Sequence, residues 1–302
     1  MKRSAFSLQP SASAAIWLQA VRPKTLPAAI APVVIGTCMA YGDGAWSVPV
    51  TVAIFLAAVL IQIGTNFAND YFDFIKGTDR ADRVGPTRAT AAGLVTPGQM
   101  RNATMLVFGL AAVLGLYLTW IGGWPIAAIG VASIASGVLY TAGPFALGYL
   151  GLGELFVLIF FGPVAVGGTY YLLTHTLTGP VLVAGLAPGL LSCAVLVVNN
   201  YRDRHTDHVT GKKTLVVRFG RGFGRIEYAV TLLGAGVLPV ALVCMSPGHA
   251  WSLLSLLTLV PGFFLVRKLW TEPDPDTMNH MLAQTGQVLV LYSVLFSVGW
   301  LV

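Results

Sequence analysis

The chain has 302 residues, of which 56% are hydrophobic and only 10% are charged. Soluble domains carry about 25% charged residues, so this composition excludes an ordinary water-soluble fold. Apolar runs of roughly 20 residues, the length that crosses a bilayer, recur along the whole sequence. We therefore predict one membrane-embedded domain over residues 1–302. Its spans should be helices, because lipid cannot satisfy open backbone groups and the sequence lacks the alternating pattern of barrel strands.

The first expected element is a short helix over residues 11–22 that lies at the membrane interface. Nine spans should follow, at residues 25–41, 50–73, 102–121, 124–140, 152–173, 180–202, 226–246, 250–269 and 281–302. The expected fold is all-α and polytopic, with nine transmembrane helices around a central cavity.

The positive charges predict the orientation. With a cytosolic N-terminus and nine spans, all 18 Lys and Arg residues fall on the cytosolic side. Cytosolic loops are enriched in these residues, so we expect a cytosolic N-terminus and an external C-terminus. The net charge of +6 then favours membrane lipid as a partner, and no nucleic-acid partner is expected. Two cytosolic connections, 74–101 and 203–225, are long and basic, and we predict that they form the active-site loops.

Acidic and amide residues share one helix face at the end of two spans. The second span ends with Asn66, Asp70 and Asp73, and the sixth ends with Asn200, Asp203 and Asp207. At about 100° per residue, each set falls within roughly 60° of the helix circumference. Solvated caps would explain a single acid of this kind, but carboxylates at a helix C-terminus oppose the helix dipole. The repeat therefore favours a functional site.

Four converging carboxylates repel each other and need a cation nearby. Hard oxygen ligands without His or Cys suit Mg²⁺, which is often bound together with substrate phosphates. Basic residues near the same spans could bind the remaining phosphate oxygens: Lys24, Arg83, Arg88, Lys212, Lys213 and Arg218. This pattern predicts a diphosphate ligand that arrives from the cytosol. The competing hypothesis is a secondary transporter, but transporters place their sites near the bilayer midplane rather than at one face.

The two acidic motifs resemble those of the UbiA superfamily of intramembrane prenyltransferases. Residues 69–73 (NDYFD), 83–88 (RVGPTR), 148–154 (GYLGLGE) and 167–171 (GGTYY) are similar to the branch that prenylates 1,4-dihydroxy-2-naphthoate. Hydroxybenzoate-prenylating relatives carry a third acid where this chain has Gly77, and a lysine shortly after the tyrosine that corresponds to Tyr140. Neither is present here, which favours a different acceptor.

The resemblance implies a reaction and its cofactor. Two Mg²⁺ ions, held by Asp70, Asp73, Asp203 and Asp207 with help from the asparagines, would bridge a polyprenyl diphosphate. The prenyl chain would move to dihydroxynaphthoate with loss of CO₂ and diphosphate, giving demethylmenaquinol in a bacterial inner membrane. Another aromatic acceptor, from the ubiquinone, chlorophyll, tocopherol or haem-O pathways, is the alternative.

Five further residues are weaker candidates for contact with the acceptor or for stabilising a cation: Arg22, Gln62, Tyr140, Glu154 and Tyr201. Each has an ordinary structural explanation as well. The two tyrosines suit a membrane interface, and an acid such as Glu154 is favoured at a helix N-terminus.

Overall fold

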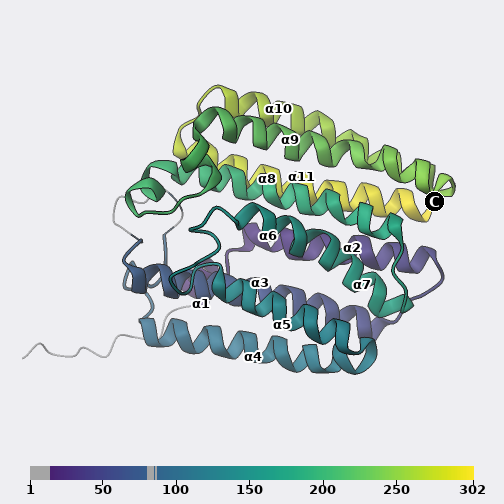
Figure 1. Ribbon diagram of the computed structural model, residues 1–302, viewed down its shortest axis with the longest axis horizontal. Coiled ribbons are helices and arrows are strands. Elements are labelled where there is room, and N and C mark those ends of the chain that lie inside the picture. The colour runs from purple at the N-terminus through teal and green to yellow at the C-terminus, as the bar shows by residue number, and fades with distance from the viewer. Residues whose placement is uncertain (1–13, 80–84, 86) are drawn as a thin grey trace, which may run out of the picture.

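The computed structural model describes residues 14–79, 85 and 87–302, and over this part of the chain the regular structure is entirely helical (Figure 1). In chain order the helices are α1 (Ala14–Val21), η1 (Pro23–Thr25), α2 (Leu26–Gly42), α3 (Val48–Lys76), α4 (Pro97–Gly122), α5 (Trp124–Leu139), α6 (Gly153–Ile159), η2 (Phe160–Val164), α7 (Ala165–Thr174), α8 (Gly179–Val209), α9 (Leu215–Met245), η3 (Pro247–Thr258), α10 (Leu259–Trp270) and α11 (Pro275–Leu301). The all-helical prediction is confirmed for these residues.

Within the described residues, eight helical segments are long and apolar enough to cross a membrane. The expected span at 124–140 corresponds to α5, which is apolar but has only 16 residues. At 1.5 Å per residue, α5 is about 24 Å long, against roughly 30 Å for a bilayer core. A short helix, α1, is present within the expected range 11–22, of which residues 11–13 lie outside the described residues, and it leads through η1 into α2. Its position at the membrane interface stays a prediction.

The expected connection at 203–225 is wrong in its extent. Helix α8 continues to Val209 and α9 begins at Leu215, so only residues 210–214 lie outside helices. A break remains inside α9, where Gly220 has φ of 83° and is not helical. The polar residues at positions 203–209 belong to the last turns of α8, and the basic residues at positions 215–225 belong to α9.

The helices lie side by side along one common direction (Figure 1). Helices α8 and α11 form the centre, with α9 and α10 packed on one side and α2, α7 and the α3–α5 group on the other. Four large aromatic side chains, Tyr201, Tyr228, Tyr292 and Phe296, are fully buried in the centre. The connections that follow α3, α5 and α8 all lie at the same end of the bundle, next to α1 (Figure 1).

The span between Gly153 and Thr174 is interrupted in its middle. Pro163 lacks a backbone N–H, and at Gly162 the backbone leaves helical geometry, so a π-helical turn, η2, separates α6 from α7. Helix α8 packs closely against this turn. A Cβ atom added to Gly185 would lie 2.8 Å from the Cα atom of Pro163, so glycine is required for this contact. The interruption directs Phe160 and Phe161 toward the interior of the bundle.

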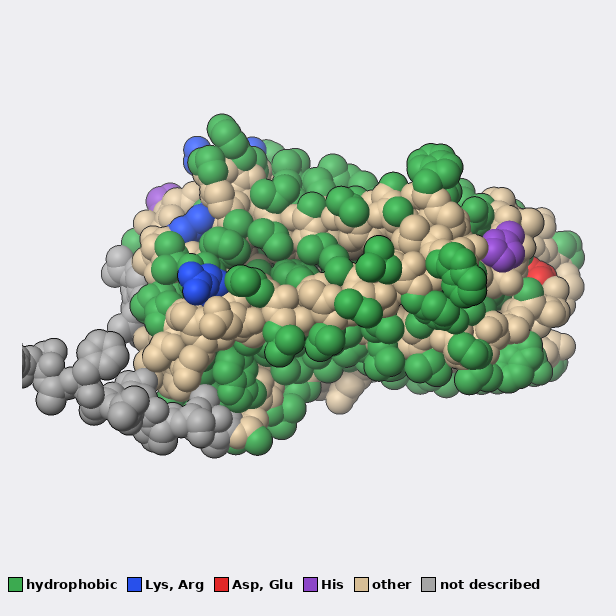
Figure 2. All heavy atoms as spheres, turned by 90° about the horizontal axis from the view of Figure 1, so that it is seen from below, with side chains coloured by type: hydrophobic (Ala, Val, Ile, Leu, Met, Phe, Trp, Pro, Cys, Tyr) green, Lys and Arg blue, Asp and Glu red, His purple; other side chains and the backbone are tan. Residues whose placement is uncertain are grey.

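The surface agrees with membrane insertion. Figure 2 shows one face covered by hydrophobic side chains along its length, with Lys and Arg only at the end where the long connections lie. Large apolar side chains, among them Leu116, Trp120 and Trp124, are more than two-thirds exposed. Such a surface is stable in lipid and not in water. Together with the apolar helices, it indicates an integral membrane protein.

Candidate active site

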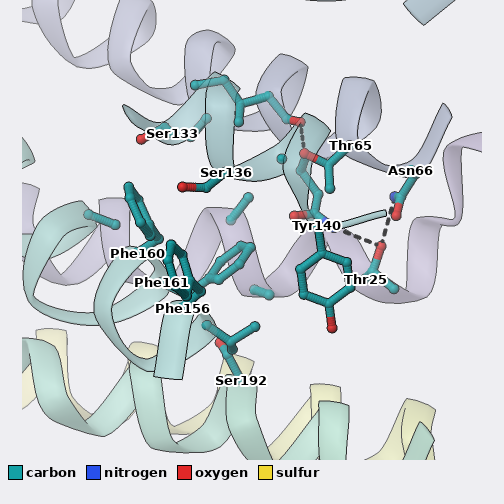
Figure 3. Close-up of a pocket in the computed structure, with 18 of the residues that line it drawn as sticks. Thr25, Thr65, Asn66, Ser133, Ser136, Tyr140, Phe156, Phe160, Phe161 and Ser192 are labelled. Atoms are coloured by element: carbon teal, nitrogen blue, oxygen red, sulfur yellow. Dashed lines mark hydrogen bonds between the residues drawn. The ribbon is translucent and has the colours of Figure 1, made fainter. Parts of the chain in front are cut away.

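A cavity of about 670 Å³ lies between α2, α3, α4, α5, α6, η2, α7 and α8. One face of α3 lines it at intervals of three or four residues, from Ile54 to Asp73. These two residues are 19 positions apart, so the lined face is about 28 Å long. Figure 3 shows Tyr140 and the aromatic side chains of α6 and η2 around this space. The cavity is therefore long enough to hold an extended, membrane-soluble ligand.

The charged residues of the cavity, its asparagines, its two tyrosines and Thr141 gather toward the ends of α3 and α8 that carry the acids. They are Arg22, Lys24, Asn66, Asn69, Asp73, Arg88, Tyr140, Thr141, Tyr149, Asn199, Asn200, Asp203, Asp207 and Lys212. The opposite part is lined mainly by aliphatic side chains such as Val33, Ile54 and Leu118. This polarity suits a ligand with a charged head and an apolar tail.

Asp73 contacts an arginine, a tyrosine and a lysine. Its Oδ2 accepts a hydrogen bond from Arg88 Nη2 at 2.9 Å, and its Oδ1 accepts one from the Tyr149 hydroxyl at 2.8 Å. Lys212 Nζ lies 3.6 Å from the same Oδ1 and 4.0 Å from Asp207 Oδ1. Lys212 thus joins the acids of α3 and α8, and the two predicted acidic helix ends do share one cavity.

Asp203 forms a two-point ion pair with the preceding residue. Arg202 donates to both carboxylate oxygens at 2.7 Å, and its remaining donors reach Asn199 Oδ1 at 2.8 Å and Asn279 Oδ1 at 2.7 Å. Arg202 is only 4% exposed, so this network fixes the end of α8 against α11. Asn200 donates from Nδ2 to Glu154 Oε1 at 2.7 Å, which connects α8 to the start of α6.

Asp70 differs from the prediction. It does not line the cavity, whereas Asp73, Asp203 and Asp207 do. Its two carboxylate oxygens accept hydrogen bonds from the backbone N–H groups of Ala89 and Thr90, each at 3.0 Å. Asn69, which the sequence interpretation did not select, faces the cavity instead.

The predicted cations divide into two groups. Lys24, Arg88 and Lys212 line the cavity, whereas Lys213 and Arg218 are exposed and do not. Arg218 instead donates to the backbone carbonyls of Lys213 at 2.9 Å and Leu150 at 2.8 Å. Arg218 lies in the first turn of α9, directly after the short connection, and its guanidinium therefore lies beside these carbonyls. Arg83 lies outside the described residues.

Arg88 is prepared to bind an anion. It is only 8% exposed, and its Nη1 has no hydrogen-bond partner among the described residues. Besides Asp73, its neighbour is Asp79, whose Oδ1 lies 3.5 Å from Nε. A buried guanidinium donor without a partner is costly, and a phosphate oxygen in the cavity would satisfy it.

The weaker candidates also separate. Arg22, Gln62 and Tyr140 line the cavity, while Glu154 and Tyr201 do not. Tyr201 is buried beneath the Arg204 guanidinium, which lies 5.0 Å from the ring centroid.

The predicted ligand Asn66 ties α3 to the N-terminal helices. Its Nδ2 donates to Val21 O at 2.9 Å and to Thr25 Oγ1 at 3.0 Å (Figure 3). Gln62 Nε2 donates to the same threonine at 3.3 Å. Both amides therefore hold the α1–η1 junction, which carries Arg22, against the rim of the cavity.

Tyr149 is a central residue that the sequence interpretation missed. Its hydroxyl donates to Asp73 and lies 2.9 Å from the Thr78 hydroxyl. Lys76 Nζ lies 4.3 Å from the ring centroid and Lys212 Nζ lies 4.9 Å from it. Burial, followed by the negative charge of Asp73, raises the pKa of Tyr149 far above its ordinary value, so the phenol remains a donor.

Basic residues lie beside the acids of the site, so the expected need for a cation is partly met by the protein itself. Repulsion among the acids does not by itself demand a metal ion, because Arg88, Arg202 and Lys212 supply positive charge. Among the described residues, no three His, Cys, Asp or Glu side chains form a ready metal cluster. The lining still fits Mg²⁺, since carboxylate and amide oxygens are its preferred ligands and phosphates complete its coordination.

The fold and the cavity define a class: an integral membrane protein that can bind an amphipathic anion within its helices. Comparison with known proteins then identifies the chain as a member of the UbiA prenyltransferase family, whose model matches residues 29–298.

Several curated relatives are similar over most of their length. The 1,4-dihydroxy-2-naphthoate octaprenyltransferase of Escherichia coli (strain K12) is 38% identical over 295 residues, which cover 94% of each chain. The protein of the same name from Mycobacterium tuberculosis is 44% identical over 248 residues, which cover 81% of this chain and 82% of the relative.

Among solved structures, a UbiA homolog from Archaeoglobus fulgidus bound to GPP and Mg²⁺ has a TM-score of 0.66. The alignment covers 95% of this chain and all of that chain, at 15% identity. At this identity the likeness shows the fold alone.

Proposed function

We propose that this protein transfers a polyprenyl chain from its diphosphate to 1,4-dihydroxy-2-naphthoate, with loss of CO₂ and diphosphate. The product is demethylmenaquinol, an intermediate of menaquinone biosynthesis. The observation that carries the proposal is the cavity itself, which places cations and acids at one end of an apolar, bilayer-length space. The naphthoate-specific relatives support this choice of acceptor.

Binding of the diphosphate begins with the cations that line the cavity. Arg88 offers its Nη1, which has no partner within the described part of the chain, and Lys212 and Lys24 can add point charges. Mg²⁺, which we propose binds as two ions, would be held by Asp73, Asp203 and Asp207 and would neutralise the leaving diphosphate. Because the acids already have basic partners, an incoming phosphate can take over those cations while the acids turn to the metal.

Cleavage of the C–O bond leaves its electron pair on the diphosphate and a positive charge on the allylic carbon. The aromatic side chains Tyr140, Phe156 and Phe160 line the cavity (Figure 3). Their ring faces can stabilise the allylic cation and exclude water that would otherwise trap it. The carboxylated ring carbon of the acceptor then forms the new C–C bond, and CO₂ leaves while its bonding electrons return to the ring.

We further propose nine spans, with α5 as the short one, a cytosolic N-terminus and an external C-terminus. The site then opens to the cytosolic side of a bacterial inner membrane, where soluble naphthoate can arrive, while the prenyl tail stays among lipids. The support is the asymmetric distribution of Lys and Arg, which Figure 2 shows at one end of the molecule.

The direct test is turnover by purified protein in lipid nanodiscs. One polyprenyl diphosphate is incubated with a panel of aromatic acids, with Mg²⁺ or with EDTA, and products are identified by mass. We expect a prenylated, decarboxylated product from dihydroxynaphthoate only when Mg²⁺ is present. Prenylation of hydroxybenzoate with naphthoate left unchanged, or full turnover in EDTA, would refute the proposal.

A further inference from the structure

We propose that Asp70 is a positioning residue that anchors the Arg88-bearing turn, and that it is not a ligand of the metal or the diphosphate. This inference rests on the proposed function for its kinetic consequences. The family resemblance implies that Asp70 and Asp73 are both Mg²⁺ ligands. We instead assign different roles to these two acids of α3: Asp70 holds the turn, and Asp73 faces the cavity.

The anchor is a pair of hydrogen bonds to the backbone. Asp70 Oδ2 accepts from the Ala89 N–H and Oδ1 accepts from the Thr90 N–H, both at 3.0 Å. All three residues are at most 2% exposed. Hydrogen bonds that a carboxylate accepts are roughly twice as strong as those between neutral groups, and a buried environment strengthens them further.

Among the residues that the structure describes, the turn itself supplies no acceptor for these two donors. Within it, Ala92 N donates to Arg88 O at 3.0 Å, and Gly93 N donates to Thr90 O at 3.0 Å. The first N–H groups of such a turn have no carbonyl behind them, as at the start of a helix. Asp70 supplies the missing acceptor for both, in the same manner as an N-cap residue.

The position of the turn determines the position of Arg88. Arg88 directly precedes the two anchored residues, and its side chain reaches from there to Asp73 and into the cavity lining. Residues 87–96, the described stretch that includes Arg88, lie outside the helices that end at Lys76 and begin at Pro97. Without the anchor, Arg88 would have to be held by its own ion pairs, which compete with binding of the ligand.

The geometry does not favour Asp70 as a ligand. It is absent from the lining of the cavity, and the helical register places it roughly 60° around α3 from Asp73. For Asp70 to bind a metal in the cavity, both buried N–H groups would have to lose their acceptor. Asp73, one turn further along, needs no such rearrangement because it already lines the cavity.

The first test measures the turn without any substrate. In hydrogen–deuterium exchange of the intact protein in nanodiscs, Asp70→Asn should speed exchange of the peptide that contains Ala89 and Thr90 at least tenfold. Asp73→Asn, which removes a neighbouring acid of the same helix, should leave that exchange within about twofold of wild type. Unchanged exchange in Asp70→Asn would overturn the anchor, whatever reaction the protein catalyses.

The second test separates positioning from metal binding. Asp70→Asn should lower kcat/KM for the diphosphate roughly tenfold or more, with the Mg²⁺ concentration for half-maximal rate within about twofold of wild type. In Asp73→Asn that Mg²⁺ concentration should rise. A rise of similar size in Asp70→Asn would make Asp70 a metal ligand and refute the proposal.

A double-mutant cycle tests whether Asp70 acts through Arg88. If Asp70 acts through Arg88, adding Asp70→Asn to Arg88→Ala should cause less than about a twofold further loss of kcat/KM. Full additivity of the two losses would refute the coupling. If Asp70→Asn does not fold, Ala89→Pro gives a second route, since it removes one donor and keeps every carboxylate. It should reproduce the faster exchange of the turn and the unchanged Mg²⁺ requirement, and failure to do either would count against the proposal.

Discussion

Replacement of Tyr149 by Phe isolates the contribution of one hydroxyl group to the site. The variant loses the 2.8 Å hydrogen bond to Asp73 and keeps the ring between Lys76 and Lys212. A hydrogen bond to a charged group contributes about 1.5–3 kcal/mol, and each 1.36 kcal/mol corresponds to tenfold in rate. Because Tyr149 is only partly buried, we expect the lower end, a loss of about tenfold in kcat/KM for the diphosphate.

Replacement of Tyr149 by Leu removes the ring as well. The two ammonium groups then lose cation–π contacts, each of which contributes about 0.5–1 kcal/mol at a partly exposed position. We therefore expect a further loss of roughly fivefold or more, expressed mainly as a higher KM because Lys212 is no longer held over the cavity.

Initial rates in nanodiscs at saturating naphthoate and Mg²⁺ provide the measurement. Tyr228→Phe is the matched control, because it removes a hydroxyl that lies 2.7 Å from Thr285 in the core, outside the cavity lining. That control should change thermal stability and leave KM for the diphosphate unaltered. Wild-type kinetics in Tyr149→Phe, or equal kinetics in the Phe and Leu variants, would refute the assignment of separate roles to hydroxyl and ring.

Further variants test the cations, the second acid and the packing. Lys212→Ala should raise KM for the diphosphate about tenfold, while Lys213→Ala, which changes an exposed neighbour, should leave it within about twofold; equal effects would contradict the placement. Asp203→Asn should reduce turnover below one-hundredth of wild type in protein that still inserts in the membrane, measured by product mass, and retention of a tenth of the activity would argue against this acid. Gly189→Ala should lower the thermal unfolding temperature in detergent, since the new Cβ would lie 2.6 Å from a carbonyl oxygen of α6, at a cost of about 1–3 kcal/mol. Gly109→Ala, with open space at its Cβ position, is the control and should show no loss.

Helix positions and the convergence of the two acidic motifs could be predicted because both follow from periodic patterns. The expected spans differ from the helices of the structure mainly at their ends, as with α8, which continues to Val209. That error has a physical cause. Polar residues after an apolar run were interpreted as the end of a helix, but Arg202 and Asp203 are buried and hydrogen-bonded within it.

Helical register distinguishes Asn69 from Asp70 on α3. Taken with Gln62 and Asn66, Asp73 is accompanied on its face by Asn69, which lies about 40° away on the side of the apolar lining residues. Asp70 lies about 60° away on the other side. The charge of Asp70 favours it as a ligand, whereas the small and apolar residues of α3, from Ile54 onward, indicate that the cavity lies on the side of Asn69.

The contacts that the connecting segments make with Asp73 could not be predicted, because these segments have no periodic pattern. Arg88, Tyr149 and Lys212 belong to three different connections, and each contacts Asp73. Composition makes them candidates, but their positions depend on how the connections fold against the helix ends. Lys212 and Lys213 are adjacent and chemically identical, yet only the former lines the cavity, because the backbone N–H of Lys213 is bound to Tyr149 O at 2.9 Å and its side chain is left exposed. Tyr149 and Lys212 both lie more than 60 positions from Asp73 along the chain. Which cation faces the ligand is therefore determined only when the chain folds.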